Sequence, residues 1–271
     1  MKIVKKEIDN GKGFDWGRAS TDYAKFRDIY PDAFYEKIIG MGLCVKGQRV
    51  LDIGTGTGVL PRNLYKYGAK FIGSDIAENQ IEQARRLTAE AGMDISYVVS
   101  PAETVDFPAE YFDVVTACQC YVYFDKSALF PKIHSILKKS GHFCILYMGW
   151  LFEESEIVAN TEKMILKYNP HWSAYGMKRF SYDFPDEARG LFEVKDSFIY
   201  DVNVPFTRES WHGRVKTCRG IGASSLPFEI IAEFEKEHSE YMKSVPPVFE
   251  IPHFVTVLNL IKVESKKSTT I

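Results

Sequence analysis

The sequence lacks an excess of positive charge. Its 271 residues hold 34 Lys and Arg against 36 Asp and Glu, which gives a formal net charge of −2. A protein that binds the phosphate backbone of nucleic acids needs a basic surface. The composition therefore argues against a nucleic-acid partner.

Long apolar runs and ordered cysteine patterns are also missing. We find neither an apolar stretch of about 20 residues that could cross a bilayer nor a signal-peptide pattern at the start, so we expect a cytoplasmic protein without a membrane partner. The five cysteines are odd in number and lack metal-ligand spacing, which predicts no metal site. Cys118 and Cys120 could chelate as a pair, but two small buried side chains on one strand is the simpler interpretation.

Residues 50–58, with the sequence Val-Leu-Asp-Ile-Gly-Thr-Gly-Thr-Gly, predict a buried strand that ends in a glycine loop. Gly54, Gly56 and Gly58 permit positive φ and let a ligand approach the backbone. Dinucleotide-binding loops instead read G-x-G-x-x-G and hold a pyrophosphate. Here the glycines are closer together and Asp52 precedes them, a carboxylate that would repel a pyrophosphate and favour an ammonium group.

Strands and helices alternate regularly after this loop, which predicts a parallel sheet with crossover helices. The further strands are expected at 70–75, 95–99, 113–118 and 143–148. Beyond residue 150 the pattern changes. We expect a sixth strand at 192–204, a helical insertion from residue 206 and a last strand at 254–263.

The acid followed by three alternating glycines resembles the first motif of the class I S-adenosylmethionine (SAM)-dependent methyltransferases. The flanking segments resemble the type 11, trans-aconitate methyltransferase-like small-molecule group. This resemblance implies an α/β fold, with a seven-stranded, mainly parallel Rossmann-like sheet, helices on both faces and a helical substrate cover. It implies a single domain over 1–271, with a SAM-binding core at 45–150 and cover elements at 1–44 and 150–250.

The resemblance also assigns a cofactor site for SAM, with S-adenosylhomocysteine (SAH) as the product. Asp75 ends the second strand, where an acid can accept both ribose hydroxyls. Ile76 would pack on the adenine and Gln80 would reach its edge. In the family, a Tyr-x-x-x-Arg element covers the site, and a residue pair after the third strand frames the adenine. The expected cofactor-binding residues are Tyr23, Arg27, Asp52, Gly54, Gly56, Gly58, Asp75, Ile76, Gln80, Ala102, Glu103, Cys118 and Gln119.

The tip of the fourth strand is where this family handles the methyl acceptor. Relatives often read Ala-Gln-Ala-x-His-Trp-Phe-Asp here, and Gln119, Phe124 and Asp125 match, but Val122 stands in the position of the histidine. A general base is therefore not evident, and the catalytic candidates are Tyr121, His171 and His212. Expected substrate-side residues are Tyr121, Tyr123, Trp211, Arg214 and Arg219, with the two arginines able to clamp an anionic group such as a carboxylate.

The predicted function is methyl transfer from SAM to a small-molecule acceptor by in-line displacement. Two alternatives stay open at this point. A SAM-binding sensor that transfers nothing is favoured only by Val122. A nicotinamide-dependent oxidoreductase uses the same kind of sheet, but Asp52 and the close glycines argue against it. No motif in the sequence selects a particular acceptor, accepting atom or oligomeric state.

Overall fold

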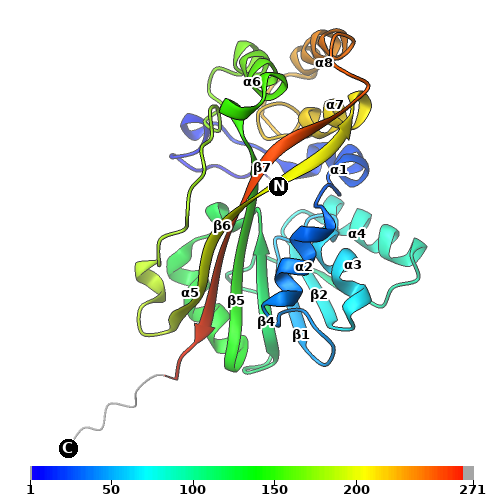
Figure 1. The fold of residues 1–271 in the computed structure, drawn as a ribbon. Coiled ribbons are helices and arrows are strands. Elements are labelled where there is room, and N and C mark those ends of the chain that lie inside the picture. The colour runs from blue at the N-terminus through cyan, green and yellow to red at the C-terminus, as the bar shows by residue number, and fades with distance from the viewer. Residues whose placement is uncertain (1, 265–271) are drawn as a thin grey trace, which may run out of the picture.

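A computed structural model describes residues 2–264. Within that range the strands form one seven-stranded sheet in the order β3-β2-β1-β4-β5-β7-β6 (Figure 1). The strands are β1 (Arg49–Ile53), β2 (Lys70–Asp75), β3 (Ser96–Val99), β4 (Phe112–Cys118), β5 (Leu137–Trp150), β6 (Phe192–Thr207) and β7 (Val248–Lys262). The helices are α1 (Ser20–Phe26), α2 (Asp32–Gly40), α3 (Val59–Leu64), α4 (Glu78–Glu90), α5 (Lys126–Ile136), α6 (Glu156–Tyr168), α7 (Arg208–Lys216) and α8 (Phe228–Met242).

The first five strands are parallel, and β7 runs antiparallel to both β5 and β6. The predicted Rossmann-like sheet with helices on both faces is therefore confirmed. The strand order reverses between β1 and β4, because β1 pairs with β2 on one side and with β4 on the other. In such sheets, ligands bind outside the carboxyl ends of the strands, at the point where the order reverses.

The sheet separates two apolar layers, as the alternation of side chains along a strand requires. Val50 and Val114 point into a layer that contains side chains of α2, α3 and α4. Leu51 and Val115 point into the opposite layer, with side chains of α5. Helix α2 was expected as part of the cover, but Phe34 and its neighbours bury it against the sheet.

Strands β6 and β7 are longer than the sequence predicted, and this is a correction of the expected helical insertion from residue 206. They pair continuously out to Thr207 and Val248. Val204 and Phe206 are buried while their neighbours are exposed, so the strand alternation continues past residue 204. The helix begins only after Thr207, whose side chain and that of Ser210 form a capping box.

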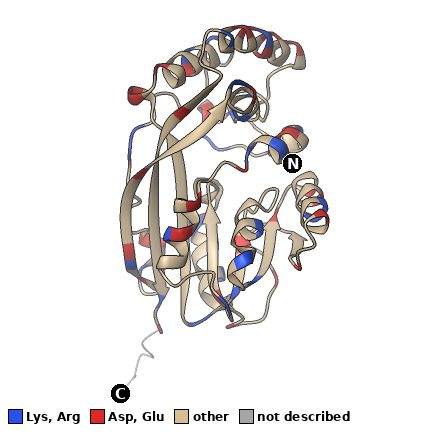
Figure 2. Cartoon of the chain, turned by 45° about the vertical axis from the view of Figure 1, so that its right-hand side comes forward, with Lys and Arg blue, Asp and Glu red and all other residues tan. Residues whose placement is uncertain are grey.

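The long strands carry a second layer of helices beyond the carboxyl end of the sheet. Figure 1 shows α6, α7 and α8 gathered there, with α1 from the N-terminal part beside α7. Figure 2 shows basic and acidic positions interspersed along the ribbon of these helices and of the sheet. The cover is thus joined to the core by strands as well as by the N-terminal segment.

Candidate functional site

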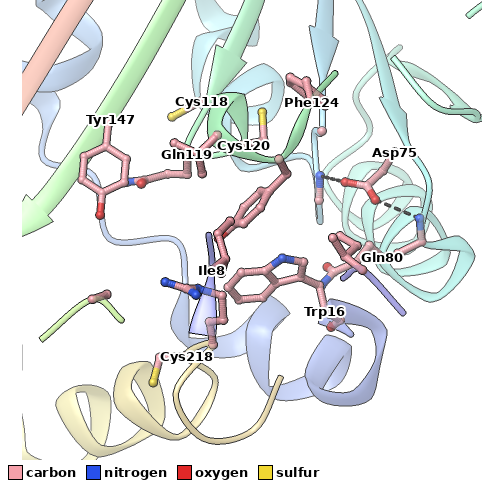
Figure 3. Close-up of a pocket in the computed structure, with 18 of the residues that line it drawn as sticks. Ile8, Trp16, Asp75, Gln80, Cys118, Gln119, Cys120, Phe124, Tyr147 and Cys218 are labelled. Atoms are coloured by element: carbon pink, nitrogen blue, oxygen red, sulfur yellow. Dashed lines mark hydrogen bonds between the residues drawn. The ribbon is translucent and has the colours of Figure 1, made fainter. Parts of the chain in front are cut away.

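A cavity of about 610 Å³ lies between the carboxyl ends of the strands and the cover. Its size falls in the range of small-molecule sites, about 300–1,000 Å³. The walls come from the N-terminal segment, the loops after β1 to β4, the end of β5, residues 172–180 and the region of α7. The cavity therefore lies where the sheet topology favours ligand binding (Figure 3).

The three loop glycines have different surroundings, although all have positive φ. A Cβ on Gly54 would lie 2.7 Å from Cβ of Cys120, and one on Gly58 would lie 2.4 Å from the hydroxyl of Tyr97. A Cβ on Gly56 would meet nothing closer than 3.9 Å. Gly54 and Gly56 line the cavity, whereas Gly58 is required by packing against β3.

Asp75 lies at the end of β2 and lines the cavity. One carboxylate oxygen accepts the backbone N–H of Gly56 at 2.9 Å, and the other accepts the backbone N–H of Ala77 at 2.8 Å (Figure 3). Burial raises the pKa of Asp75 above its ordinary value, while these N–H groups oppose the rise. A carboxylate has about four acceptor positions, so two remain for ligand hydroxyls.

Asp52 lies behind the glycine loop and does not line the cavity. Its side chain is buried and accepts a hydrogen bond of 2.7 Å from the Thr116 hydroxyl. Burial raises the pKa of Asp52 to about 6. Any influence of this carboxylate on a ligand therefore acts through the loop and not by direct contact.

Tyr23 and Arg27 form part of the cavity wall contributed by the N-terminal segment. The Arg27 guanidinium lies over the Tyr23 ring at 4.8 Å and over the Trp16 ring at 5.7 Å. Its Nε donates to the Thr217 hydroxyl at 2.9 Å and its Nη2 donates to the Thr217 carbonyl at 3.0 Å. These contacts hold the guanidinium beside the glycine loop, because Tyr23 also approaches Gly56.

The residues expected around a nucleoside also line the cavity: Ile76, Gln80, Ala102 and Glu103. Gln80 donates from Nε2 to the Trp16 carbonyl at 3.1 Å, and its buried Oε1 has no partner. That oxygen would lie 4.0 Å from a Cβ on Gly56. Gln80 is thus turned toward the glycine loop, where its free oxygen can accept an N–H.

Cys118 and Gln119 line the cavity at the tip of β4. Gln119 has a φ of 69°, an uncommon value for a residue with a side chain. Its Nε2 donates to the Met148 carbonyl at 2.7 Å. Burial raises the pKa values of the Cys118 and Cys120 thiols, so both are protonated at neutral pH.

Tyr121 and Tyr123 were both expected on the substrate side at the tip of the fourth strand, and for Tyr121 this was wrong. The strand ends at Cys118, and the two tyrosines lie in a short 3₁₀ turn, Tyr121–Tyr123. Tyr123 lines the cavity and packs on Phe14 and Trp16. Tyr121 is buried on the other side against Tyr182, away from the cavity.

Arg214 and Arg219 both line the cavity, but Trp211 does not. Trp211 is fully buried, packs on Trp150 and donates to the Thr161 hydroxyl. Trp211 therefore holds α7 against the end of β5 and against α6.

The other catalytic candidates lie outside the cavity. His171 is exposed and borders a separate small depression. His212 contacts His238, with 2.9 Å between their Nδ1 atoms, and burial lowers the pKa values of both rings. Across residues 2–264, no histidine lines the cavity.

Much of the substrate-side wall was not found from the sequence. It includes Tyr147, Met148 and Trp150 at the end of β5 and a loop segment that reaches over the cavity, with Trp172, Met177 and Phe180. The apolar run that continues past Met148 to Trp150 could have revealed that this strand extends further than expected. The loop segment carries no local signal, because only the fold brings it to the site.

Two kinds of feature are absent from the part of the chain that the structure describes. No helix there is long and apolar enough to cross a membrane. No group of three or more His, Cys, Asp or Glu side chains there could hold a metal ion.

Comparisons with known proteins agree with this geometry. The family model described as a methyltransferase domain matches residues 50–141. The chain is 36% identical over 95 residues to a ubiquinone biosynthesis O-methyltransferase of Brucella anthropi, which is 35% of this chain and 38% of the relative. It is 27% identical over 161 residues to a Dictyostelium discoideum protein that carries a methyltransferase name, 59% of this chain and 57% of the relative.

A likeness to solved structures extends further along the chain. The crystal structure of the YcgJ protein from Bacillus subtilis matches with a TM-score of 0.52 and 19% identity, over 84% of this chain and 97% of the other. At this identity the match shows the fold alone. The sequence matches, by contrast, span less than two thirds of the length of the curated relatives named above.

Proposed function

Because the matched core belongs to the class I SAM-dependent methyltransferases, we propose that the whole protein transfers a methyl group from SAM to a small-molecule acceptor. The observation that carries this proposal is the position of Asp75 beside Gly56 in a cavity of about 610 Å³ at the strand ends. The finer assignment to the trans-aconitate methyltransferase-like group stays a prediction.

The residues of the cavity fit SAM at three points. Asp75 keeps free acceptor positions for two ribose hydroxyls. The backbone at Gly56 is open to the cavity, so the amino-acid part of the cofactor can lie against it. The Arg27 guanidinium has no carboxylate partner among the described residues and would bind the SAM carboxylate.

SAM supplies, when bound, a methyl group activated on a sulfonium. The protein then needs to orient the acceptor and exclude water, and a general base is not required for every acceptor. The cover does both in this proposal: residues 2–31 and 150–250 lie over a cofactor-binding core at 45–150. The absence of histidine from the described cavity wall agrees with a mechanism based on alignment.

The proposal is tested by incubating the protein with methyl-labelled SAM and a small-molecule cell extract. We expect label to appear in compounds that pass an ultrafiltration membrane, and calorimetry to show binding of SAH but not of NAD. A matched control is Gly56→Val, which fills the open side of the loop and should abolish both the transfer of label and the binding of SAH. Binding of SAH without any transferred label would favour the sensor, and binding of NAD alone would favour the oxidoreductase.

A further inference from the structure

Arg214 is a buried cation without a carboxylate partner among the described residues. Its side chain lies in the cavity wall and the residue is only 8% exposed. Its Nε and Nη1 are buried and make no hydrogen bond, and it forms no salt bridge with any carboxylate that the structure describes. A charge this deeply buried is normally paired, because burial removes its hydration.

The contact that Arg214 does make is with an aromatic ring. Its guanidinium lies over the Trp150 ring at 4.9 Å. The Trp150 indole N–H donates to Glu162 at 2.6 Å, and the other oxygen of Glu162 accepts the Gly176 backbone N–H at 2.7 Å. Both oxygens of the Glu162 carboxylate thus accept N–H groups and hold the Trp150 ring in place beneath Arg214.

The other arginines of the cavity differ from Arg214. Arg219 is paired with Asp9, with 2.6 Å between Nη1 and Oδ1. Arg27 is held beside the glycine loop through Tyr23 and Thr217. Among the described residues, two guanidinium groups without a carboxylate partner therefore face the cavity: Arg27 beside the glycine loop, and Arg214 of α7 over Trp150 at the end of β5.

The acidic and basic side chains of the cavity come from different parts of the chain. The acids Asp75 and Glu103 follow strand ends, whereas the bases come from the cover: Lys2, Arg27, Arg214 and Arg219. The wall next to Arg214 is apolar and aromatic. Tyr147 packs on Phe180 with ring centroids 5.3 Å apart, and its hydroxyl donates to the Met177 sulfur at 3.0 Å.

We propose that Arg214 binds a carboxylate of the methyl acceptor, so that the substrate is a small organic acid whose carbon skeleton packs on Trp150, Tyr147 and Phe180. The inference rests on the proposed function, because the single carboxylate of SAM is assigned to Arg27 and leaves Arg214 for the acceptor. One unpaired guanidinium matches one carboxylate in charge, and its planar fork matches the carboxylate in shape.

The test measures how the SAH-loaded protein binds simple acids. The probes are benzoate, phenylacetate, 3-phenylpropionate and hexanoate, each compared with its primary amide by calorimetry and thermal shift. We expect at least one acid to bind about thirtyfold or more tightly than its amide, the size of a buried charge-pair contribution. An absence of any preference for the acids would overturn the proposal without the use of a variant.

Two variants then assign the preference to Arg214. Arg214→Met keeps the length and apolar contacts of the side chain, and we expect it to reduce the ratio between acid and amide to about one. Arg214→Gln serves if the first variant does not fold. Arg208→Met is the matched control on the same helix, because Arg208 donates to the Val245 carbonyl and does not line the cavity. A preference that survives in both Arg214 variants would contradict the inference.

The cofactor comparison separates this inference from the proposed function. If Arg214→Met weakens binding of SAH but not of 5′-methylthioadenosine, which lacks the amino-acid carboxylate, then Arg214 serves the cofactor and the inference is wrong. If the wild-type protein binds neither nucleoside, the proposed function fails, whatever the acids do.

Discussion

Replacing Asp75 with Asn tests the cofactor site most directly. Asn keeps the size of the side chain but can accept only one of the two backbone N–H groups, from Gly56 and Ala77, that Asp75 accepts. It also removes the negative charge from the two acceptor positions that face the cavity.

The expected loss follows from these contacts. Hydrogen bonds to a charged group contribute about 1.5–3 kcal/mol each. Losing the charge at two ribose hydroxyls should therefore cost at least about 2 kcal/mol, which is about a thirtyfold increase in Kd. The lost backbone contact should lower the free energy of unfolding by about 1–2 kcal/mol.

Calorimetry with SAH and with adenosine measures the effect, and urea unfolding measures stability. Adenosine should lose as much affinity as SAH, because both carry the ribose. Asp113→Asn is the matched control, since Asp113 accepts the Arg49 backbone N–H and pairs with Lys138. Asp113 lies at the start of β4, at the end of the strand away from the cavity. This variant should lose similar stability and bind SAH as the wild type does. An Asp75→Asn protein that binds SAH within threefold of the wild type would refute the assignment.

The remaining predictions concern the glycine loop, the buried carboxyl group of Asp52 and the histidine His212. Gly58→Ala places a Cβ against Tyr97 at positive φ and should cost about 3 kcal/mol of stability, measured in urea. Gly56→Ala should cost only about 1 kcal/mol of stability yet weaken SAH binding at least about tenfold, and an equal effect of both variants on stability would contradict this. Burial raises the pKa of Asp52 from 3.8 to about 6, so this carboxyl group binds its proton more tightly in the folded protein than in the unfolded chain. The contribution of Asp52 to the free energy of unfolding therefore falls as the pH rises from about 3.8 to about 6. The stability of Asp52→Asn relative to wild type should therefore grow by about 2 kcal/mol between pH 4 and 7, and a difference that does not vary with pH would argue against this. His212→Gln should transfer label from SAM within about twofold of wild type; a larger loss would return His212 to the mechanism.

The core of the fold could be predicted because its signals are local. A short apolar run that ends in alternating glycines can hardly be anything but a buried strand and a tight loop, as β1 and Gly54 confirm. The alternation of strands and helices then leaves a right-handed parallel sheet as the expected arrangement. Asp75 at the end of β2 was found by the same reasoning, because a strand end is fixed by sequence.

The substrate side depended on contacts between distant segments. Arg214 and Arg219 look alike in the sequence, and only the approach of Asp9, more than 200 residues away, makes one paired and leaves the other unpaired. The turn after Cys118 sends Tyr121 and Tyr123 to opposite sides, which a strand periodicity could not reveal.

The sequence by itself thus determined the sheet, the glycine loop and the carboxylate at the strand end, because each is specified by residues close together in the chain. Only the tertiary structure decided which charges face the cavity and which are already neutralised. The physical reason is that burial and pairing depend on neighbours through space, and those neighbours come from the N-terminal segment, β5 and the cover.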